Sequence, residues 1–304
     1  MKGCTVGGVT LPHGPYMIGA GVCKNPKTTK EWLKVASVVS GSYTPLPREG
    51  NQGKLFYPDT LEEVRRLGYG LNSFGMPNVG FVEAIKELSE IVSEQPLIVS
   101  IAGFSVADYR KGVETMRIVS NVSAIELNFG CPNTNHGEIA SFKPNTISTI
   151  LEDIVDIECN KPIWVKVSPY SNPANLCAAA EVLNEFKDEL KLALVTCNTF
   201  PFAYAGKGKF DPIQGRAGLS GPALKHIALG QVHQFRELLD VTIDVIGVGG
   251  IMNGDDIIDF LDAGATAVQM TSWPFWAGNP GRFMDELTNS IRFFEYLELN
   301  HSEA

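Results

Sequence analysis

The segment NFGCPNTNHG (128–137) places a single cysteine among amide side chains, directly after an apolar run. Cys131 lies there between Asn128 and Asn133. A thiol among polar donors can lose its proton near neutral pH and act as a nucleophile or a general base. His136 follows in the same segment but is more typical of a surface residue, so a Cys/His hydrolase is the weaker interpretation. We predict that Cys131 is a general base; the alternative is a structural thiol.

A lysine interrupts the apolar segment WVKVSPY (164–170). An ammonium group in such a segment is unfavourable unless it is paired or serves a ligand. The segment itself contains no acidic residue. We predict that Lys166 points inward, toward an electron-rich cofactor atom such as the polar edge of a flavin. The alternative is a lysine whose stem is buried while its ammonium group reaches solvent at a rim.

Two further amide side chains follow apolar runs: Asn72 in LNSFGMPN (71–78) and Asn198 in TCNTF (196–200), the latter next to Thr199. Any one asparagine in such a place is most often a helix cap or a turn residue. If the amides converge with those beside Cys131, they would orient a flat ring that is rich in amide groups.

Glycine-rich segments indicate an anion site. GVGG (247–250) precedes a predicted helix, and QMTS (269–272) ends an apolar run. Backbone N–H groups of glycine-rich turns at a helix start can bind an anion. The segment AGLSGPA (217–223) could add a further donor. We predict a phosphate site, although plain tight turns remain the alternative.

The elements that must position these residues are short apolar runs that alternate with helical patterns, such as those of 81–94 and 255–261. Continuous apolar strands separated by helices are typical of parallel strands that are buried on both faces. We predict a (β/α)8 TIM barrel as a single domain, 1–304, and leave an open doubly wound sheet as the alternative. The predicted strands are 15–20, 35–40, 96–102, 123–129, 162–168, 192–198, 243–249 and 266–272.

In such a barrel the carboxyl ends of all strands form one face, where active sites are built. The predicted site residues lie at or just after strand ends, so we expect them to meet there. The interval between the second and third strands is long and rich in proline and glycine. It predicts an elaborated loop over this face.

Composition excludes several classes of function. The chain has 304 residues, a formal net charge of −9 and no basic block, which argues against a nucleic-acid surface. It contains no run of roughly 20 apolar residues, so we predict a cytoplasmic protein without a membrane span. Its six cysteines form neither a C-x-x-C motif nor a His/Cys cluster, which argues against a metal site and a disulfide scaffold.

Several motifs occur together in one order: LNSFGMPNVGF, SIAG, NFGCPN, VKVSPY, GLSGPAL and IGVGGI followed by GATAVQ. In this combination the chain resembles the class 1 dihydroorotate dehydrogenases, which are FMN-dependent (β/α)8 barrels of pyrimidine biosynthesis. The similarity covers nearly the whole chain and is greater to the soluble class 1A branch than to the membrane-attached class 2 enzymes, whose base is a serine.

The resemblance implies roles for individual residues. Cys131 is similar to the catalytic base, and Lys166 to the lysine on the flavin ring. The substrate-holding residues that it implies are Asn72, Asn128, Asn133, Asn198 and Thr199. The FMN-binding residues that it implies, besides Lys166, are Ala20, Gly21, Asn128, Gly221, Gly249, Gly250, Thr271 and Ser272.

The implied reaction is the oxidation of dihydroorotate to orotate. Cys131 would remove a proton beside a ring carbonyl while a hydride leaves the adjacent carbon for the flavin. The resemblance also implies a second oxidant substrate such as fumarate, and a homodimer. An NAD-linked enzyme would instead need an iron–sulfur partner subunit.

One departure from the family pattern concerns charge. The family carries a lysine after the second strand, near FMN and the substrate carboxylate, where this chain has Gly41 in SVVSGSYTPLPREG (37–50). Lys24 is the alternative source of that charge. Phe129-Gly130 also replaces the usual Leu-Ser of the family. A flavin enzyme acting on a ring or enone without a carboxylate is therefore a second hypothesis, and a non-redox barrel that binds a phosphorylated ligand is a third.

Overall fold

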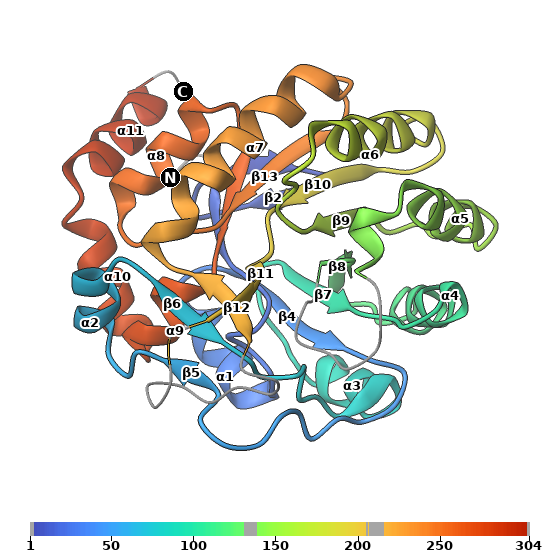
Figure 1. Ribbon diagram of the computed structural model, residues 1–304, viewed down its shortest axis with the longest axis horizontal. Helices are drawn as coiled ribbons and strands as arrows, with labels where there is room; N and C mark the ends of the chain where they lie inside the picture. Colours follow the sequence, from blue (N-terminus) through green and yellow to red (C-terminus); the bar gives the residue numbers. More distant parts are fainter. Residues whose placement is uncertain (1–2, 131–138, 205, 207–215, 303–304) are drawn as a thin grey trace.

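The computed structural model describes residues 3–130, 139–204, 206 and 216–302. Within them eight parallel strands close into a barrel in the order β10-β13-β14-β3-β4-β7-β8-β9 (Figure 1). All eight predicted strands are confirmed, and the closed barrel excludes an open doubly wound sheet. The barrel strands are β3 (Tyr16–Ile18), β4 (Ser37–Tyr43), β7 (Leu97–Ile101), β8 (Val122–Asn128), β9 (Ile163–Val167), β10 (Leu192–Thr196), β13 (Asp244–Val248) and β14 (Ala267–Met270).

Helices surround the strands as an outer layer, as Figure 1 shows. Of the two segments predicted to be helical, 255–261 is confirmed by α8, whereas 81–94 is too long because α3 ends at Ser89. Phe81 is buried in α3 while Val82 is 70% exposed. The helices of this layer are α1 (Pro26–Trp32), α3 (Gly80–Ser89), α4 (Val106–Met116), α5 (Pro144–Val155), α6 (Pro173–Glu185), α7 (Lys225–Leu238), α8 (Gly254–Asp262) and α11 (Ile291–Ser302).

The barrel interior changes in polarity along its axis. Successive side chains of a strand point to opposite faces, so every second residue lies inside. On β8 the alternate residues are Ala124, Glu126 and Asn128, and on β9 they begin with Trp164 and Lys166. Ala124 and Trp164 belong to an interior apolar cluster. The same strands therefore provide an apolar layer, then charged side chains, then an amide.

A β-hairpin closes the amino-terminal end of the barrel. It consists of β1 (Cys4–Val6) and β2 (Val9–Leu11), whose apolar side chains join the interior cluster of Trp164. The Gly7 N–H at the turn donates to Asp244 Oδ2 at 2.6 Å, and the Trp164 Nε1–H donates to the Gly7 carbonyl at 3.2 Å. Gly7 has φ +51°, and a Cβ there would lie 2.4 Å from Trp164 Nε1. This turn therefore requires glycine.

The opposite end of the barrel carries a second sheet, which lies in Figure 1 beside α2 and α9. Its strands pair antiparallel in the order β11-β12-β6-β5. Part of it comes from the interval between β4 and β7, which confirms the predicted elaboration of that loop; the sheet itself was not predicted. The strands of this sheet are β5 (Phe56–Tyr57), β6 (Gly70–Asn72), β11 (Phe200–Ala203) and β12 (Ala217–Ser220). The remaining helices are α2 (Leu61–Leu67), α9 (Ser272–Ala277) and α10 (Pro280–Thr288).

None of the helices in the described ranges is long and apolar enough to cross a membrane.

Candidate functional site

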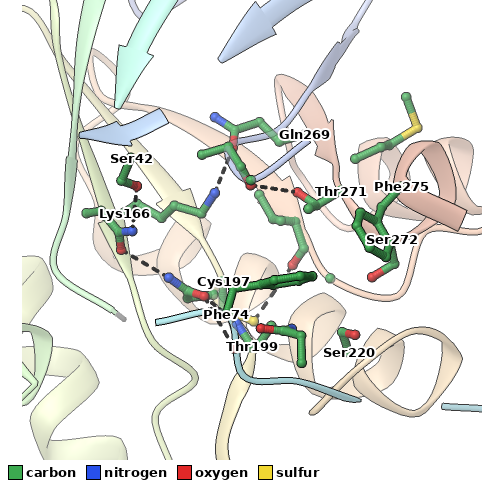
Figure 2. Close-up of a pocket in the computed structure, with 18 of the residues that line it drawn as sticks. Ser42, Phe74, Lys166, Cys197, Thr199, Ser220, Gln269, Thr271, Ser272 and Phe275 are labelled. Carbon is green, nitrogen blue, oxygen red and sulfur yellow. Dashed lines mark hydrogen bonds between the residues drawn. The ribbon is translucent and has the colours of Figure 1, made fainter. Parts of the chain in front are cut away.

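A pocket opens between the carboxyl ends of the barrel strands and the second sheet (Figure 2). The empty space between its walls is about 1140 Å³, a figure that includes the open solvent at its mouth. Eleven of the predicted site residues line it. They are Ala20, Gly21, Asn72, Asn128, Lys166, Asn198, Thr199, Gly249, Gly250, Thr271 and Ser272.

Three predicted site residues are not placed in this way. Cys131 and Asn133 lie outside the described residues. Gly221 is described but does not line the pocket, whereas its neighbour Ser220 does. Gly221 has φ +73°, and a Cβ there would lie 2.9 Å from the Gly70 nitrogen. Its glycine is therefore explained by the close approach of β6 to this turn.

The amides of Asn128 and Asn198 are oriented by each other. Asn198 Nδ2 donates to Asn128 Oδ1 at 3.0 Å, and Asn128 Nδ2 donates to Ser42 Oγ at 2.9 Å. The Thr199 N–H donates to Asn198 Oδ1 at 2.7 Å, so this oxygen is also engaged. Ser42 Oγ in turn lies 2.8 Å from Ser100 Oγ. These hydrogen bonds hold the two amides in one orientation before any ligand arrives.

Local backbone bonds bring the same asparagines to the pocket. In the register of β8 and β9, Asn128 pairs with Lys166. The Asn198 N–H donates to the Val167 carbonyl at 2.8 Å, which fixes the chain just beyond β10 beside β9. Asn72 arrives differently, because it ends β6 and pairs with Gly218 of the second sheet. The amides therefore converge from the barrel rim and from the sheet above it.

Lys166 takes part in a buried polar cluster that the sequence did not reveal. Its Nζ donates to Gln269 Oε1 at 3.0 Å and lies 3.7 Å from Glu126 Oε1. Gln269 Nε2 completes the cluster by donating to Glu126 Oε2 at 2.7 Å. Glu126 and Gln269 are 0% exposed, and Lys166 is 4% exposed. Figure 2 shows the lysine extending toward Gln269.

The predicted inward lysine is therefore present, but an acid compensates its charge. That acid comes from β8 rather than from the lysine's own strand. A buried ion pair requires additional hydrogen bonds to offset desolvation, and Gln269 provides two of them. The Glu126 Oε1 atom nevertheless has no hydrogen-bond partner among the described residues. The cluster forms the floor of the pocket, where Lys166 and Gln269 belong to the lining and Glu126 lies beneath them.

The glycine-rich turn after β13 forms another wall. Gly249 has φ +121° and Gly250 has φ +78°, and a Cβ on Gly250 would lie 2.5 Å from the Lys225 nitrogen. These positions therefore keep the backbone itself at the pocket surface. Ser220 Oγ, buried and lining the pocket, has no hydrogen-bond partner among the described residues. Thr271 and Ser272 lie on the side of the pocket opposite Ser42 in Figure 2.

Side chains pair two backbone N–H groups at the start of α8. Asn253 Oδ1 accepts the Asp256 N–H at 2.9 Å, and Asp256 Oδ2 accepts the Met252 N–H at 2.7 Å. Two of the donors at this helix start are thus already paired, and a carboxylate lies beside them. The expected anion site is better supplied by Gly249-Gly250, Ser220 and the Thr271-Ser272 pair than by the helix itself.

An aromatic wall completes the pocket. Phe74 and Phe275 pack edge to face with ring centroids 5.6 Å apart, and Phe275 packs on Trp276 at 5.1 Å. All three residues line the pocket. Phe74 precedes Phe275 and Trp276 by about 200 residues, so no local pattern could show that it meets them. Such a wall provides the apolar surface against which a flat ring packs.

Cys197 is a thiol in the described pocket lining, but it is not a candidate base. Burial raises its pKa to about 12, although the nearby Lys166 ammonium opposes this shift. Its Sγ lies 3.7 Å from the Val248 carbonyl, to which the thiol donates. Cys197 is therefore protonated at neutral pH and contributes a small apolar surface.

Gly41 lines the pocket beside Ser42. It has φ +112°, and a Cβ there would lie 2.5 Å from the Ser100 carbonyl oxygen. A side chain at this position would require the backbone to move. The absence of a lysine here is therefore built into the local conformation of β4.

The chemistry of these donors fits a flavin mononucleotide. The orphaned Ser220 hydroxyl and the paired glycines suit a phosphate group, Lys166 suits an electron-rich ring edge, and the aromatic wall suits a flat ring system. Among the described residues no cluster of His, Cys, Asp or Glu could hold a metal ion.

Comparisons with known proteins agree on one family. The family model described as dihydroorotate dehydrogenase matches residues 3–287. The chain is 34% identical over 278 residues to dihydroorotate dehydrogenase A (fumarate) of Limosilactobacillus reuteri, with 88% of this chain and 85% of the relative covered. It is 32% identical over 292 residues to dihydroorotate dehydrogenase B (NAD(+)), catalytic subunit, of Geobacter sulfurreducens, with 93% and 90% covered.

Among solved structures, a DHODH from Eimeria tenella in complex with ferulenol superposes with a TM-score of 0.77. The alignment covers 95% of this chain and 84% of that chain at 20% sequence identity. At this identity the likeness concerns the fold, and it confirms the barrel with its ring of helices.

Proposed function

The chain belongs to the dihydroorotate dehydrogenase family, and we propose that it is an FMN-dependent enzyme that oxidises dihydroorotate to orotate. The observation that carries this proposal is the pocket in which Asn72, Asn128, Asn198 and Lys166 converge. Dihydroorotate is a ring with amide and imide groups, and amide side chains offer it matching donors and acceptors.

The hydrogen bonds among the amides explain how the substrate would be oriented. Asn128 and Asn198 are already fixed by Ser42 and by the Thr199 N–H. Little side-chain entropy is then lost on binding, because the partners are held beforehand. Asn72 approaches from β6, so the ring would lie between the barrel rim and the second sheet.

FMN, when bound, supplies the redox chemistry that amino-acid side chains lack. We propose that Gly249, Gly250, Ser220, Thr271 and Ser272 hold its phosphate and ribityl chain. Lys166 would face the polar edge of its ring, with Glu126 fixing the lysine from below. Ala20 and Gly21, which line the pocket at the end of β3, would contact the ring.

We propose Cys131 as the base that removes the proton next to the substrate's ring carbonyl. Support comes from the described residue that precedes it. Gly130 donates its N–H to Asn128 Oδ1 at 3.2 Å, and a Cβ there would lie 2.9 Å from Asn198 Cβ. The chain thus enters the segment of Cys131 and Asn133 directly from the amide cluster. Asn133 is proposed as a further substrate-holding amide.

For the electron acceptor we propose fumarate or a similar compound. One relative of this chain is named for fumarate, and another is the catalytic subunit of an NAD(+)-named enzyme. We further propose a cytoplasmic homodimer, as the resemblance to class 1A enzymes implies. Steady-state assays that offer either acceptor to the reduced protein would decide between the two.

The experiment that tests the proposal is an anaerobic titration of the FMN-loaded protein with dihydroorotate, followed by the flavin absorbance. We expect stoichiometric bleaching and release of orotate. A protein that binds FMN but remains oxidised would contradict dihydroorotate as the substrate. A protein that cannot be loaded with FMN would contradict redox chemistry altogether and favour a phosphate-ligand-binding barrel.

One observation favours a second candidate function. In the observed backbone conformation, the position of Gly41 cannot accommodate a side chain, and therefore cannot provide a cation. The candidate is a flavin oxidoreductase for a related ring or enone without a carboxylate. Bleaching by such a neutral compound, but not by dihydroorotate, would support it.

A further inference from the structure

Glu126 is a carboxylate buried directly beneath the pocket. It is 0% exposed and does not itself line the pocket, whereas Lys166 and Gln269 do. Among the described lining residues there is no carboxylate. Glu126 is therefore an anion placed behind the surface that a ligand meets, and the lysine in front of it carries the charge that the ligand contacts.

Barrel closure brings this cluster together from opposite sides. Glu126 and Lys166 belong to the neighbouring strands β8 and β9, whereas β14, which carries Gln269, is separated from β8 by three strands in either direction. Gln269 thus reaches across the interior, where its Nε2 donates to Glu126 Oε2 at 2.7 Å and its Oε1 accepts from Lys166 Nζ at 3.0 Å. One amide side chain therefore holds both charged groups in place.

The two charges are close but do not form a direct hydrogen bond. Lys166 Nζ lies 3.7 Å from Glu126 Oε1, which is beyond hydrogen-bond distance, and this oxygen has no hydrogen-bond partner among the described residues. A buried ion pair stabilises a fold only if its remaining lone pairs are satisfied, and a buried polar atom without a partner requires an explanation. The explanation we draw is that Glu126 acts on the lysine through its charge.

The charge at this position matters for a bound flavin, because reduction adds negative charge to the flavin ring and nearby protein charges tune its electronics. A cation at the polar edge of the ring favours the reduced form. A carboxylate behind that cation opposes the effect, since the Coulomb energies of the two charges have opposite signs. A flavin that one substrate reduces and another reoxidises works best if neither form is strongly favoured.

We propose that Glu126 is a positioning residue that lowers the reduction potential of bound FMN by compensating part of the charge of Lys166. This inference rests on the proposed function, because it requires FMN to lie against Lys166. It deepens that function by assigning to a residue outside the pocket lining the control of how readily the cofactor releases its electrons.

The test is the reduction potential of the FMN-loaded protein, measured by titration with a chemical reductant against a reference dye. Glu126→Gln keeps the shape of the side chain and an oxygen for Gln269 Nε2, but it removes the charge. We expect the equilibrium to shift about tenfold toward reduced FMN, which is a rise of about 30 mV for a two-electron couple.

Glu126→Asp is the second variant, and it decides the question if Glu126→Gln yields no folded protein. It keeps the charge on a shorter side chain and should raise the reduction potential by less than the full loss of charge does. The matched control is Glu114→Gln, which removes the carboxylate of an exposed ion pair with Arg110 on α4. It should leave the reduction potential unchanged.

The two half-reactions distinguish control of the potential from a merely structural role. Glu126→Gln should speed the reduction of FMN by dihydroorotate and slow its reoxidation by fumarate, whereas a structural defect would slow both. A reduction potential of Glu126→Gln that is equal to or below that of the wild type overturns the inference. Slowing of both half-reactions overturns it as well.

The reduction potential also separates this inference from the proposed function, because its measurement needs no substrate. If dihydroorotate does not reduce the wild type but Glu126→Gln raises the potential, the proposed substrate is overturned and the inference is supported. If dihydroorotate reduces the wild type but neither Glu126 variant changes the potential, the inference alone is overturned. A wild type that cannot be loaded with FMN overturns both.

Discussion

The two ends of the barrel are built from the same strands but differ in chemistry. At the amino-terminal end, the β1–β2 hairpin packs on Trp164 and Ala124 in an apolar cluster. At the carboxyl-terminal end, two residues further along each of the same strands, the interior holds Glu126 and Lys166. One end buries apolar surface, whereas the other holds oriented polar groups.

This difference shows where stability and function are separated. Apolar packing is non-directional and proportional to the area removed from water. Hydrogen-bonded groups such as Asn128 and Asn198 instead require defined partners. We therefore expect substitutions at the closed end to change the free energy of unfolding. Substitutions at the open end should mainly change ligand binding and flavin reduction.

The largest expected effect is at the open end. Cys131→Ala removes the proposed base and should slow flavin reduction by dihydroorotate by about 10²–10⁴-fold, roughly 3–5 kcal/mol of barrier. FMN content should be retained. Anaerobic stopped-flow absorbance measures the rate, and Cys177→Ala in α6 is the control thiol. Reduction at the wild-type rate would show that another group is the base.

At the closed end, Trp164→Ala should lower the free energy of unfolding by about 4 kcal/mol, because it leaves a cavity beneath the hairpin. It also removes the hydrogen bond to the Gly7 carbonyl. Urea unfolding measures the loss. Trp164→Phe, which keeps most of the volume, should be affected less. A folded Trp164→Ala protein with slower flavin reduction than the wild type would argue against a separation of the two ends.

The cluster between the ends should show both effects. Lys166→Met leaves Glu126 buried without its cation and should lower the free energy of unfolding by about 3 kcal/mol. The double variant Lys166→Met/Glu126→Gln removes both charges and should recover most of this stability, but not FMN affinity. Urea unfolding and FMN titration measure the two quantities. Full recovery of FMN affinity in the double variant would contradict the role of Lys166 at the ring.

The smallest effect concerns the support of the open end by Glu286 of α10. Partial burial raises the pKa of this carboxyl, but its hydrogen bonds to Arg65, Trp273 and Arg282 outweigh burial and lower the pKa overall. A lowered pKa in the folded state stabilises the protein above the ordinary pKa of glutamate, about 4.3. This stabilisation is lost as the pH falls through the lowered folded pKa.

Glu286→Gln should therefore reduce the free energy of unfolding at pH 7 by about 1 kcal/mol and make its loss in acid less steep. Urea unfolding between pH 7 and pH 3 measures both changes. Glu295→Gln on the exposed face of α11 is the control. If the wild type and Glu286→Gln lose stability equally in acid, this carboxyl does not contribute to the pH dependence of the free energy of unfolding.

The sequence predicted most of the barrel architecture and about half of the arrangement of the site. Eight apolar runs predicted eight barrel strands, and polar residues at their ends predicted a shared rim, because both signals are local. The helix predicted over 81–94 was too long, because α3 ends at Ser89. Val82 is exposed, and Asn253 and Asp256 pair donors at the α8 start. Neither the exposure of Val82 nor the pairing of these backbone donors can be inferred from the spacing of apolar residues alone.

By itself, the sequence determined which residues could do chemistry and which strand carries each of them. Alternation of side chains fixed Lys166 as an inward residue and Asn128 as a rim residue. Only the tertiary structure decided their partners. Glu126 meets Gln269 across 143 positions of sequence, and Lys24 comes to lie beside Gly41 through backbone hydrogen bonds between the β3–α1 loop and β4. The physical reason is that charge compensation depends on distance in space, which barrel closure sets and which no local pattern encodes.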